Sequence, residues 1–248
     1  MTRPLLEICL DTPAGLAAAV AGGAQRIELC AALDSEGLTP SPGLMAQAGV
    51  CGCETFALIR SRAGDFVFGD LDLDAMRRDI DAARAAGLAG VVLGASRPDG
   101  RLDEQGLADL IAHASGLGVA LHRAFDVTPD KAEALETAIG LGFERILTSG
   151  GRPGAPEGVA LIAELVQRAG ERIVIMAGAG LEPGNVADFV RRTGVKEVHA
   201  AARAPLPAPI GAVEGGGLSA ELGFVTPGLQ DTSQAVVQAM RRALDGLG

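Results

Sequence analysis

The sequence contains no tryptophan and no tyrosine, and it has seven phenylalanines among 248 residues. A site that stacks aromatic rings on sugars or nucleobases is therefore disfavoured. The sequence also lacks any run of lysine and arginine, its formal net charge is −10, and its pI is about 4.8. Such a surface repels phosphates, so we expect neither a nucleic acid nor an anionic membrane as a partner.

Long apolar segments are missing as well. No stretch of about 18 consecutive apolar residues is free of charged or helix-breaking residues, so we expect no transmembrane helix. The first residues, MTRPLLEICLDT, reach Glu7 and Asp11 too soon for a secretory signal peptide. We therefore expect a cytoplasmic protein, in which the four cysteines are free thiols.

What the sequence does contain is a repeated local pattern, as in AAGLAGVVLG and RAGERIVIMAG. An Ala- or Leu-rich amphipathic segment ends at glycine, which favours the left-handed cap of a helix, and a short apolar run follows, which predicts a buried strand. The predicted strands cover 5–9, 26–30, 55–60, 90–94, 118–122, 145–148, 172–176 and 196–200. The predicted helices cover 13–21, 42–49, 72–86, 103–115, 130–140, 156–169, 183–192 and 232–246.

This alternation predicts a (β/α)8 TIM barrel that forms a single domain over residues 1–248. The rival is a doubly wound open sheet. No GxGxxG follows the first strand, which weakens the dinucleotide-binding form of that rival, and no organic cofactor is indicated. Two long segments, 61–71 and 201–230, follow strands and would lie on the face where barrel enzymes build their sites.

Polar side chains recur near the C-terminal ends of the predicted strands, which a barrel gathers into one mouth. Burying an unpaired charge costs several kcal/mol, so these groups should pair there or meet a polar ligand. One buried acid alone indicates a structural salt bridge, but several from different strands favour a site. His122 and His199 are the natural acid–base groups, because histidine titrates near neutral pH. The catalytic candidates are Glu7, Glu28, Arg60, His122, Asp126 and His199.

Two glycine-rich turns, TSGG at 148–151 and AGAGLEPGN at 177–185, follow late strands. Exposed backbone N–H groups at such turns attract anions, and barrels often bind phosphate there. The glycines could instead serve only tight turns. The candidate anion-binding groups are the backbone of Gly150, Gly151, Gly178, Ala179 and Gly180, the hydroxyls of Thr148 and Ser149, and the guanidinium groups of Arg60 and Arg62.

Cys9 and Cys30 each stand two residues after a glutamate, on strands that are neighbours in a barrel. Their sulfurs could approach each other, and two thiolates suit two-coordinate Cu(I) but not structural zinc, which takes four ligands. The alternative is that both cysteines fill core space. The CGC at 51–53 lies at the other end of the barrel and is structural or incidental.

Together these segments resemble the CutC family, long called copper homeostasis proteins. The matching motifs, in order from residue 5 to about 203, are LLEICLD, RIELCAAL, GLTPSPG, IRSRAGDFVF, LHRAFD, LGFERILTSGG, IMAGAGL and EVHAAAR. The resemblance implies a TIM barrel, a cytoplasmic location, dimers or tetramers, and a Cu(I) site at the cysteines that match Cys9 and Cys30. The family pattern RPRGGDF reads RSRAGDF here, and the region after Ala204 is only loosely similar.

Two functional hypotheses follow. The first is a Cu(I)-binding homeostasis protein with Cys9 and Cys30 as ligands. The second is a barrel enzyme that acts on a small anion such as a phosphate or a sugar acid, with His122 or a carboxylate as base and Arg60 and Arg62 holding the anion. A non-catalytic scaffold is a third reading, against which the buried charges argue.

Overall fold

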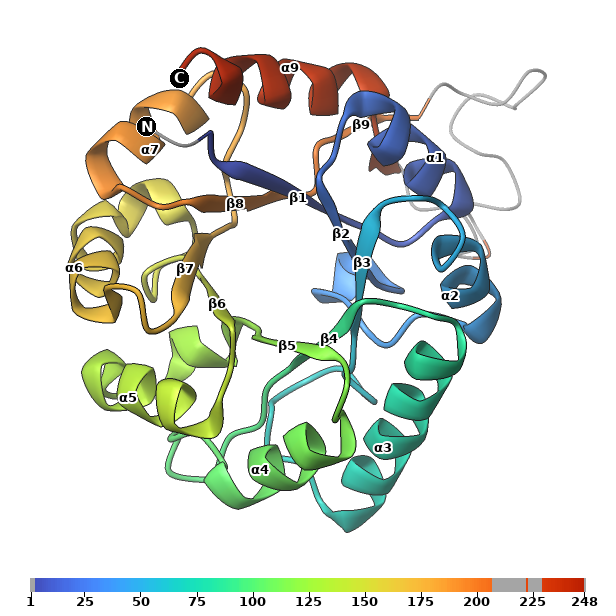
Figure 1. Cartoon of the computed structure of the whole chain (residues 1–248), viewed down its shortest axis with the longest axis vertical. Coiled ribbons are helices and arrows are strands. Elements are labelled where there is room, and N and C mark those ends of the chain that lie inside the picture. The colour runs from blue at the N-terminus through green and yellow to red at the C-terminus, as the bar shows by residue number, and fades with distance from the viewer. Residues whose placement is uncertain (1–2, 207–221, 223–228, 248) are drawn as a thin grey trace.

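A computed structural model describes residues 3–206, 222 and 229–247. Eight parallel strands close into a barrel in chain order, and helices form a ring around it (Figure 1). The predicted TIM barrel is confirmed. The strands of the barrel are β1 (Leu5–Leu10), β2 (Arg26–Leu29), β3 (Glu54–Leu58), β4 (Gly90–Leu93), β5 (Gly118–Leu121), β6 (Arg145–Thr148), β7 (Val174–Ala177) and β8 (Glu197–Ala200).

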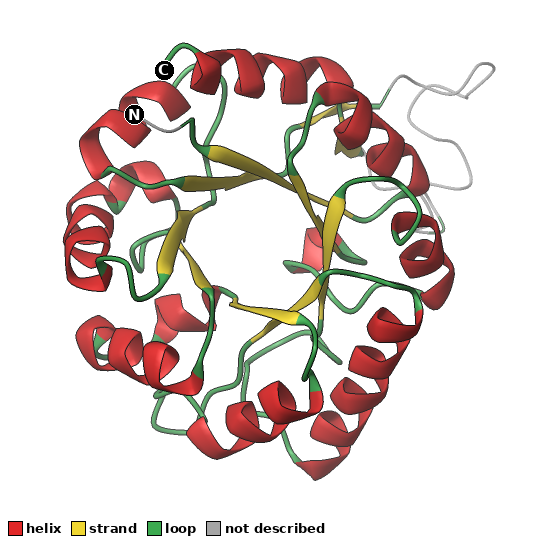
Figure 2. Ribbon diagram, in the orientation of Figure 1, coloured by secondary structure: helices red, strands yellow, loops and turns green. Residues whose placement is uncertain are grey.

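The outer ring of helices follows the strands around the barrel, as Figure 2 shows. Their apolar faces pack on the outside of the strands in one continuous core. The helices are α1 (Pro13–Gly22), α2 (Pro42–Ala48), α3 (Asp70–Ala85), α4 (Glu104–His113), α5 (Lys131–Leu141), α6 (Val159–Ala169), α7 (Val186–Thr193) and α9 (Gln234–Asp245), with short 3-10 turns η1 (Leu33–Ser35), η2 (Arg123–Val127) and η3 (Ala155–Glu157).

Local sequence signals explain where helix α1 begins and ends. The Thr12 hydroxyl accepts a hydrogen bond from the Gly15 N–H, and Pro13 occupies the first turn, where its missing N–H costs nothing. Gly23 then ends the helix with φ 91°, a left-handed conformation that glycine adopts without strain.

The lower interior of the barrel is filled by Phe56. A Cβ on Gly90 or Gly118 would lie 2.2 or 2.8 Å from its ring, so the next two strands, β4 and β5, both need glycine to admit it. Phe56 belongs to a smaller apolar cluster that also includes Cys9, Cys30 and Leu58. These side chains fill the interior of the barrel, and active sites of such barrels lie at the C-terminal ends of the strands.

Three predicted segments differ most from the observed elements. The predicted helix 156–169 is split, because Gly158 ends η3 and packs so tightly that a Cβ there would lie 2.1 Å from the Ser149 carbonyl. Helix α7 begins three residues late, since Asn185 caps a turn by accepting from the Glu182 N–H. Within the predicted loop 201–230, the two ends pair as an antiparallel hairpin, β9 (Arg203–Pro205) with β10 (Gln230–Thr232), while most of the rest lies outside the described residues.

None of the helices formed by the described residues is long and apolar enough to cross a membrane.

Candidate functional site at the barrel mouth

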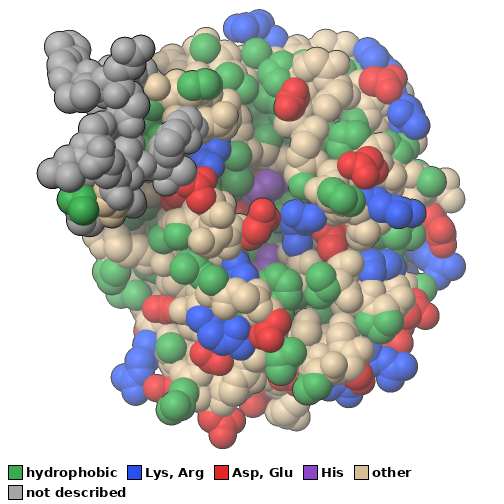
Figure 3. Space-filling model, turned by 180° about the vertical axis from the view of Figure 1, so that it is seen from behind, with side chains coloured by type: hydrophobic (Ala, Val, Ile, Leu, Met, Phe, Trp, Pro, Cys, Tyr) green, Lys and Arg blue, Asp and Glu red, His purple; other side chains and the backbone are tan. Residues whose placement is uncertain are grey.

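A cavity of about 870 Å³ opens at the C-terminal ends of the strands. Histidine side chains are visible near the centre of this face, among acidic and basic groups (Figure 3). The structure brings together at its wall Cys9, Glu28, Cys30, Arg60, His122, Asp126, Ala179, Gly180 and His199. The remaining candidates, which do not line it, are Glu7, Arg62, Thr148, Ser149, Gly150, Gly151 and Gly178.

His199 is held between two buried carboxylates. Its Nδ1 lies 2.7 Å from Glu7 Oε1, and its Nε2 lies 3.7 Å from Glu28 Oε2. The strand register produces this arrangement, since Glu7 stands beside His199 across β1 and β8. Burial alone would lower the pKa of His199, but the neighbouring Cys9, Glu7 and Glu28 raise that pKa well above its ordinary value. Glu7 thus lies beneath the cavity and acts on it through His199.

Cys9 completes a compact group of donor atoms. One ligand atom each from Cys9, Glu28 and His199 lies within 4.8 Å of the others, and all three side chains are buried. Burial raises the pKa of Glu28 to about 7, although His199 opposes the shift. The site therefore offers a sulfur, an imidazole nitrogen and a carboxylate oxygen to one ligand.

The two cysteines are not level with each other, which corrects the matching offsets expected from the sequence. Cys9 is the register partner of Glu28, while the Cys30 N–H donates one step further along, to the Leu10 carbonyl. Closing a barrel staggers neighbouring strands, so equal counts from a glutamate do not give equal heights. Cys30 Sγ instead lies 3.8 Å from Glu28 Oε2, and burial raises its pKa well above the ordinary value.

His122 and Arg60 lie on another part of the wall, next to Phe66. His122 follows β5 rather than ending it, and its Nδ1 accepts from the Ala124 N–H at 3.0 Å. Burial, together with the nearby Arg60 charge, lowers the pKa of His122 to about 3. The ring is therefore neutral at pH 7.

The TSGG turn is filled by the protein's own carboxylate. Asp126 accepts from the N–H groups of Ser149 and Gly151, both at 2.9 Å, and the Gly150 N–H donates to the Thr148 hydroxyl. Burial would raise the pKa of Asp126, but hydrogen bonds from the Thr148 hydroxyl, the Ser149 and Gly151 N–H groups and the Arg123 guanidinium outweigh burial and lower that pKa. The expectation that these N–H groups are free for an anion was therefore wrong, because Asp126 from η2 reaches them first.

The second glycine-rich turn remains open. Within the described part of the chain, the N–H groups of Ala179 and Gly180 donate no hydrogen bond, and both residues line the cavity. An anion at these two groups stays a prediction. Arg62 is engaged elsewhere, with Asp65 and Asp72.

Sequence reasoning missed a layer of charge beneath the site. Arg26 lies 2.7 Å from Glu197, 3.3 Å from Glu7 and 3.2 Å from Glu54. Arg145 lies 3.2 Å from the same Glu197. Both guanidinium groups stack on the Phe56 ring, at 5.6 and 4.9 Å. The signal was present in the alternation of strand residues, since Arg26 stands two before Glu28, and Glu197 two before His199.

Backbone strain also concentrates near the mouth. Among the described residues, the non-glycine residues with positive φ are Ala32, Glu36, Ala179 and Ala202. All four follow the C-terminal ends of β2, β7 or β8, and three of them line the cavity. Such conformations cost roughly 1–3 kcal/mol each and cluster at functional sites.

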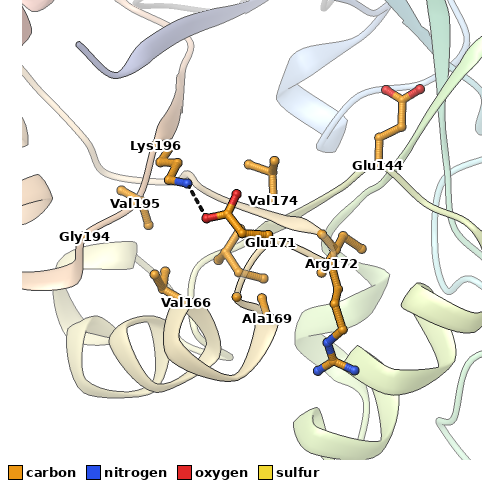
Figure 4. Close-up of a pocket in the computed structure, with 12 residues that line it drawn as sticks. Glu144, Val166, Ala169, Glu171, Arg172, Val174, Gly194, Val195 and Lys196 are labelled. Carbon is orange, nitrogen blue, oxygen red and sulfur yellow. Dashed lines mark hydrogen bonds and ion pairs between the residues drawn. The ribbon is translucent and has the colours of Figure 1, made fainter. Parts of the chain in front are cut away.

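A smaller cavity of about 150 Å³ lies at the opposite end, where β7 and β8 begin (Figure 4). Its polar rim is an exposed ion pair, Lys196 Nζ to Glu171 Oε1 at 3.0 Å, over apolar groups such as Val166 and Ala169. Its charged side chains, Glu144, Glu171, Arg172 and Lys196, are exposed to solvent, and the active sites of barrel enzymes lie at the other face.

The sequence matches the CutC family over residues 4–204. The chain belongs to the CutC family. A family protein CutC of Caulobacter vibrioides is 57% identical over 245 residues, which cover 99% of this chain and 98% of that protein. Another, from Sinorhizobium medicae, is 54% identical over 247 residues and covers 100% of this chain and 98% of its own length.

Solved structures agree with this membership. The crystal structure of CutC from Streptococcus agalactiae, described as a proposed copper homeostasis protein, matches with a TM-score of 0.77 and 33% identity over 80% of this chain and 98% of that one. Phosphoribosyl anthranilate isomerase from Thermotoga maritima matches with a TM-score of 0.56 at 14% identity, over 98% of this chain and 100% of that one. The latter shows the shared barrel and no more.

Proposed function

We propose that this CutC-family chain binds Cu(I) as cargo at the barrel mouth, mainly through the Cys9 thiolate and the His199 imidazole. One observation carries the proposal: Cys9, Glu28 and His199 place their donor atoms within 4.8 Å of one another. Thiolate and imidazole both suit copper. The description of the Streptococcus agalactiae relative as a proposed copper homeostasis protein supports the same reading.

The surroundings of His199 favour a metal ligand. Its Nδ1 is held by Glu7, which leaves Nε2 to face the cavity, and Glu7 is itself held by Arg26. A carboxylate that orients the far nitrogen of a ligating histidine is a common feature of metal sites, and its loss typically weakens binding about 10–100-fold. A cytoplasmic location, which keeps Cys9 reduced, and assembly as a dimer or tetramer fit this proposal and stay predictions.

Cys30 and Glu28 set the choice of metal. The Cys30 thiol lies in the same buried cluster as Cys9, and we propose it as a further sulfur near the site. Glu28 offers a hard oxygen, which suits a divalent ion such as Zn²⁺ better than Cu(I). We therefore expect Cu(I) to depend on sulfur and Zn²⁺ to depend on the carboxylate.

Anaerobic titration of Cu(I) against a competing chelator tests the proposal. Cys9→Ser and His199→Ala should lose the site, Glu7→Gln should weaken it about 10–100-fold, and Cys30→Ser should weaken it less than Cys9→Ser. Glu28→Gln should spare Cu(I) and weaken Zn²⁺. Cys51→Ser, a thiol at the opposite end, is the matched control. Equal losses in Cys9→Ser and Cys30→Ser would favour the two-cysteine site, and unchanged binding in both would return the cysteines to packing.

A second candidate function is an enzyme that acts on a small anionic molecule. The observation that favours it is the cavity of about 870 Å³, because an ion needs far less room and small-molecule sites span roughly 300–1,000 Å³. Incubation with mixed sugar acids and sugar phosphates, followed by mass spectrometry, should reveal one that is consumed. Consumption should stop in Glu28→Gln and persist in Arg78→Ala, which changes an exposed side chain. Equal consumption by both variants would exclude the mouth as the active site.

A further inference from the structure

Arg60 is a buried cation whose hydrogen-bonding capacity is only partly used. Its Nη1 donates to the carbonyls of Ser35 and Gly37 at 3.0 and 2.9 Å, and its Nη2 donates to the Gly64 carbonyl at 2.8 Å. A guanidinium has five N–H donors, so two remain, on Nε and on Nη2. Nε is buried and has no partner among the described residues. Two donors on adjacent nitrogens match the two oxygens of a carboxylate.

Arg60 also lacks a counter-charge. Among the described arginines that line the cavity, Arg123 pairs with Asp126, and Arg203 pairs with Asp34. No described carboxylate lies within 4.0 Å of Arg60, although the side chain is 5% exposed. Main-chain carbonyls hold the group in place but cannot neutralise it. A buried charge of this kind is stabilised by an anion that arrives from the cavity.

His122 supplies a second donor beside it. Since Nδ1 accepts from the Ala124 N–H, the proton of the neutral ring is on Nε2. Nε2 is buried and has no partner among the described residues, and the side chain is 5% exposed. The Phe66 ring packs against both groups, with its centroid 4.9 Å from the His122 ring and 5.2 Å from Arg60 Cζ. Phe66 is half-buried and lines the cavity, as Arg60 and His122 do, so a ligand that approaches both groups from the cavity meets this ring.

We propose that Arg60 and His122 form a binding site for the carboxylate of a small hydroxylated organic acid, which displaces the Phe66 ring. Arg60 takes the two carboxylate oxygens, and His122 Nε2–H donates to one of them or to the neighbouring hydroxyl. The acids Glu28 and Glu182, elsewhere on the wall, and Glu36, whose charge acts on Arg60 from beyond ion-pair distance, accept hydrogen bonds from further hydroxyls.

The charge of the wall favours a carboxylate over a phosphate. One unpaired guanidinium matches one negative charge. A phosphate monoester carries nearly two at pH 7 and would face Glu28, Glu36 and Glu182 as well. A singly charged carboxylate loses less hydration free energy than a dianion when it leaves water, so its burial also costs less free energy.

This inference deepens the second candidate function and rests on it for its biological meaning, but it does not depend on the metal. None of its donors belongs to the group Cys9, Glu28 and His199. Binding and turnover can therefore fail separately. If the acid binds without turnover, the enzymatic hypothesis is rejected and the carboxylate site is retained. If turnover occurs and is unaffected by substitution of Arg60 and His122, the enzymatic hypothesis is retained and the carboxylate site is rejected.

The experiment uses glycolate, which carries one carboxylate and one hydroxyl, on the full chain with chelator present. Side-chain ¹⁵N spectra of the histidines at pH 7 report the His122 Nε2–H directly. Glycolate should shift this signal and leave that of His113, while ethylene glycol, with hydroxyls only, should shift neither. Inorganic phosphate should bind more weakly than glycolate. Phosphate that binds more tightly, or glycolate that fails to shift the signal at millimolar concentrations, would overturn the assignment.

Two variants separate binding from folding. His122→Asn keeps a side-chain acceptor for the Ala124 N–H and loses the Nε2 donor. Arg60→Lys keeps the charge and loses the fork. Each should weaken glycolate about 10–100-fold, the loss expected for a hydrogen bond to a charged group. Arg78→Ala should bind as the unchanged protein does. Retained binding in both folded variants would reject the site, and if one fails to fold the other decides.

Discussion

Arg26 and Arg60 are both buried arginines inside the same barrel, 3% and 5% exposed. Arg26, at the N-terminal end of β2, contacts the carboxylates of Glu7, Glu54 and Glu197. Arg60, at the C-terminal end of β3, contacts main-chain carbonyls. The two side chains are buried to a similar extent, but carboxylates neutralise only the charge of Arg26. Carboxylates of the protein compensate the charge of Arg26 at the bottom of the barrel, whereas we propose that a ligand compensates the charge of Arg60 at the mouth.

Removing Arg26 from the layer of charge beneath the site should have the largest effect on stability. Arg26→Met removes a buried partner of both Glu7 and Glu197, which keep only His199 and Arg145 respectively. This change should lower the free energy of unfolding by about 3–5 kcal/mol. Urea unfolding measures this. The double variant Arg26→Met with Glu197→Gln should recover part of the loss, since it removes one stranded charge.

The mouth provides the comparison for that result. Arg60→Met leaves no stranded carboxylate, so it should cost less than Arg26→Met. If both variants lose the same free energy of unfolding, pairing with carboxylates does not distinguish the arginine at the bottom of the barrel from the one at the mouth.

Glu28 should give the next largest effect, and it depends on pH. Burial raises its pKa from 4.5 to about 7. Its contribution to stability is therefore present below pH 4.5 and is lost as the pH rises through 7. Because glutamine does not titrate, Glu28→Gln should gain about 3 kcal/mol relative to the wild type between pH 4.5 and 8. Urea unfolding at both pH values measures the gain, and a constant difference would contradict the raised pKa.

His122 should give a slightly smaller effect of the opposite sign. Burial lowers its pKa from 6.5 to about 3. Its contribution is present above pH 6.5 and is lost as the pH falls towards 3, because the unfolded chain takes up a proton that the folded chain refuses. The wild type should therefore lose about 2–3 kcal/mol relative to His122→Asn between pH 7 and 4.5. If the free energy of unfolding depends on pH in the same way in both proteins, the His122 ring is accessible to water. The difference between the buried charges at the two ends of the barrel would then be smaller than proposed.

Several features of the site could be predicted from the sequence because they depend on local patterns. Glu28, Arg60, His122 and His199 follow or end short apolar runs, and the C-terminal ends of parallel strands meet at one face. Strand alternation could also have revealed Arg26. These predictions need only the positions of the residues along their strands.

Other features could not be predicted because they depend on how elements meet. The stagger between β1 and β2 decides that Cys9 stands beside Glu28 rather than Cys30. The reach of Asp126 from η2 decides that the TSGG turn is already filled. The spacing of residues within one segment determines neither the stagger between the two strands nor the position of Asp126 relative to the turn.

The sequence by itself determined the barrel and the face on which the polar groups gather, because helix caps and short apolar runs act within a few residues of each other. Tertiary structure alone decided which charges are paired. Glu7 meets His199 across 192 residues, and Arg26 meets Glu197 across 171, whereas Arg60 meets no described carboxylate. Pairing depends on the closure of the barrel, which fixes distances between strands that no local pattern contains.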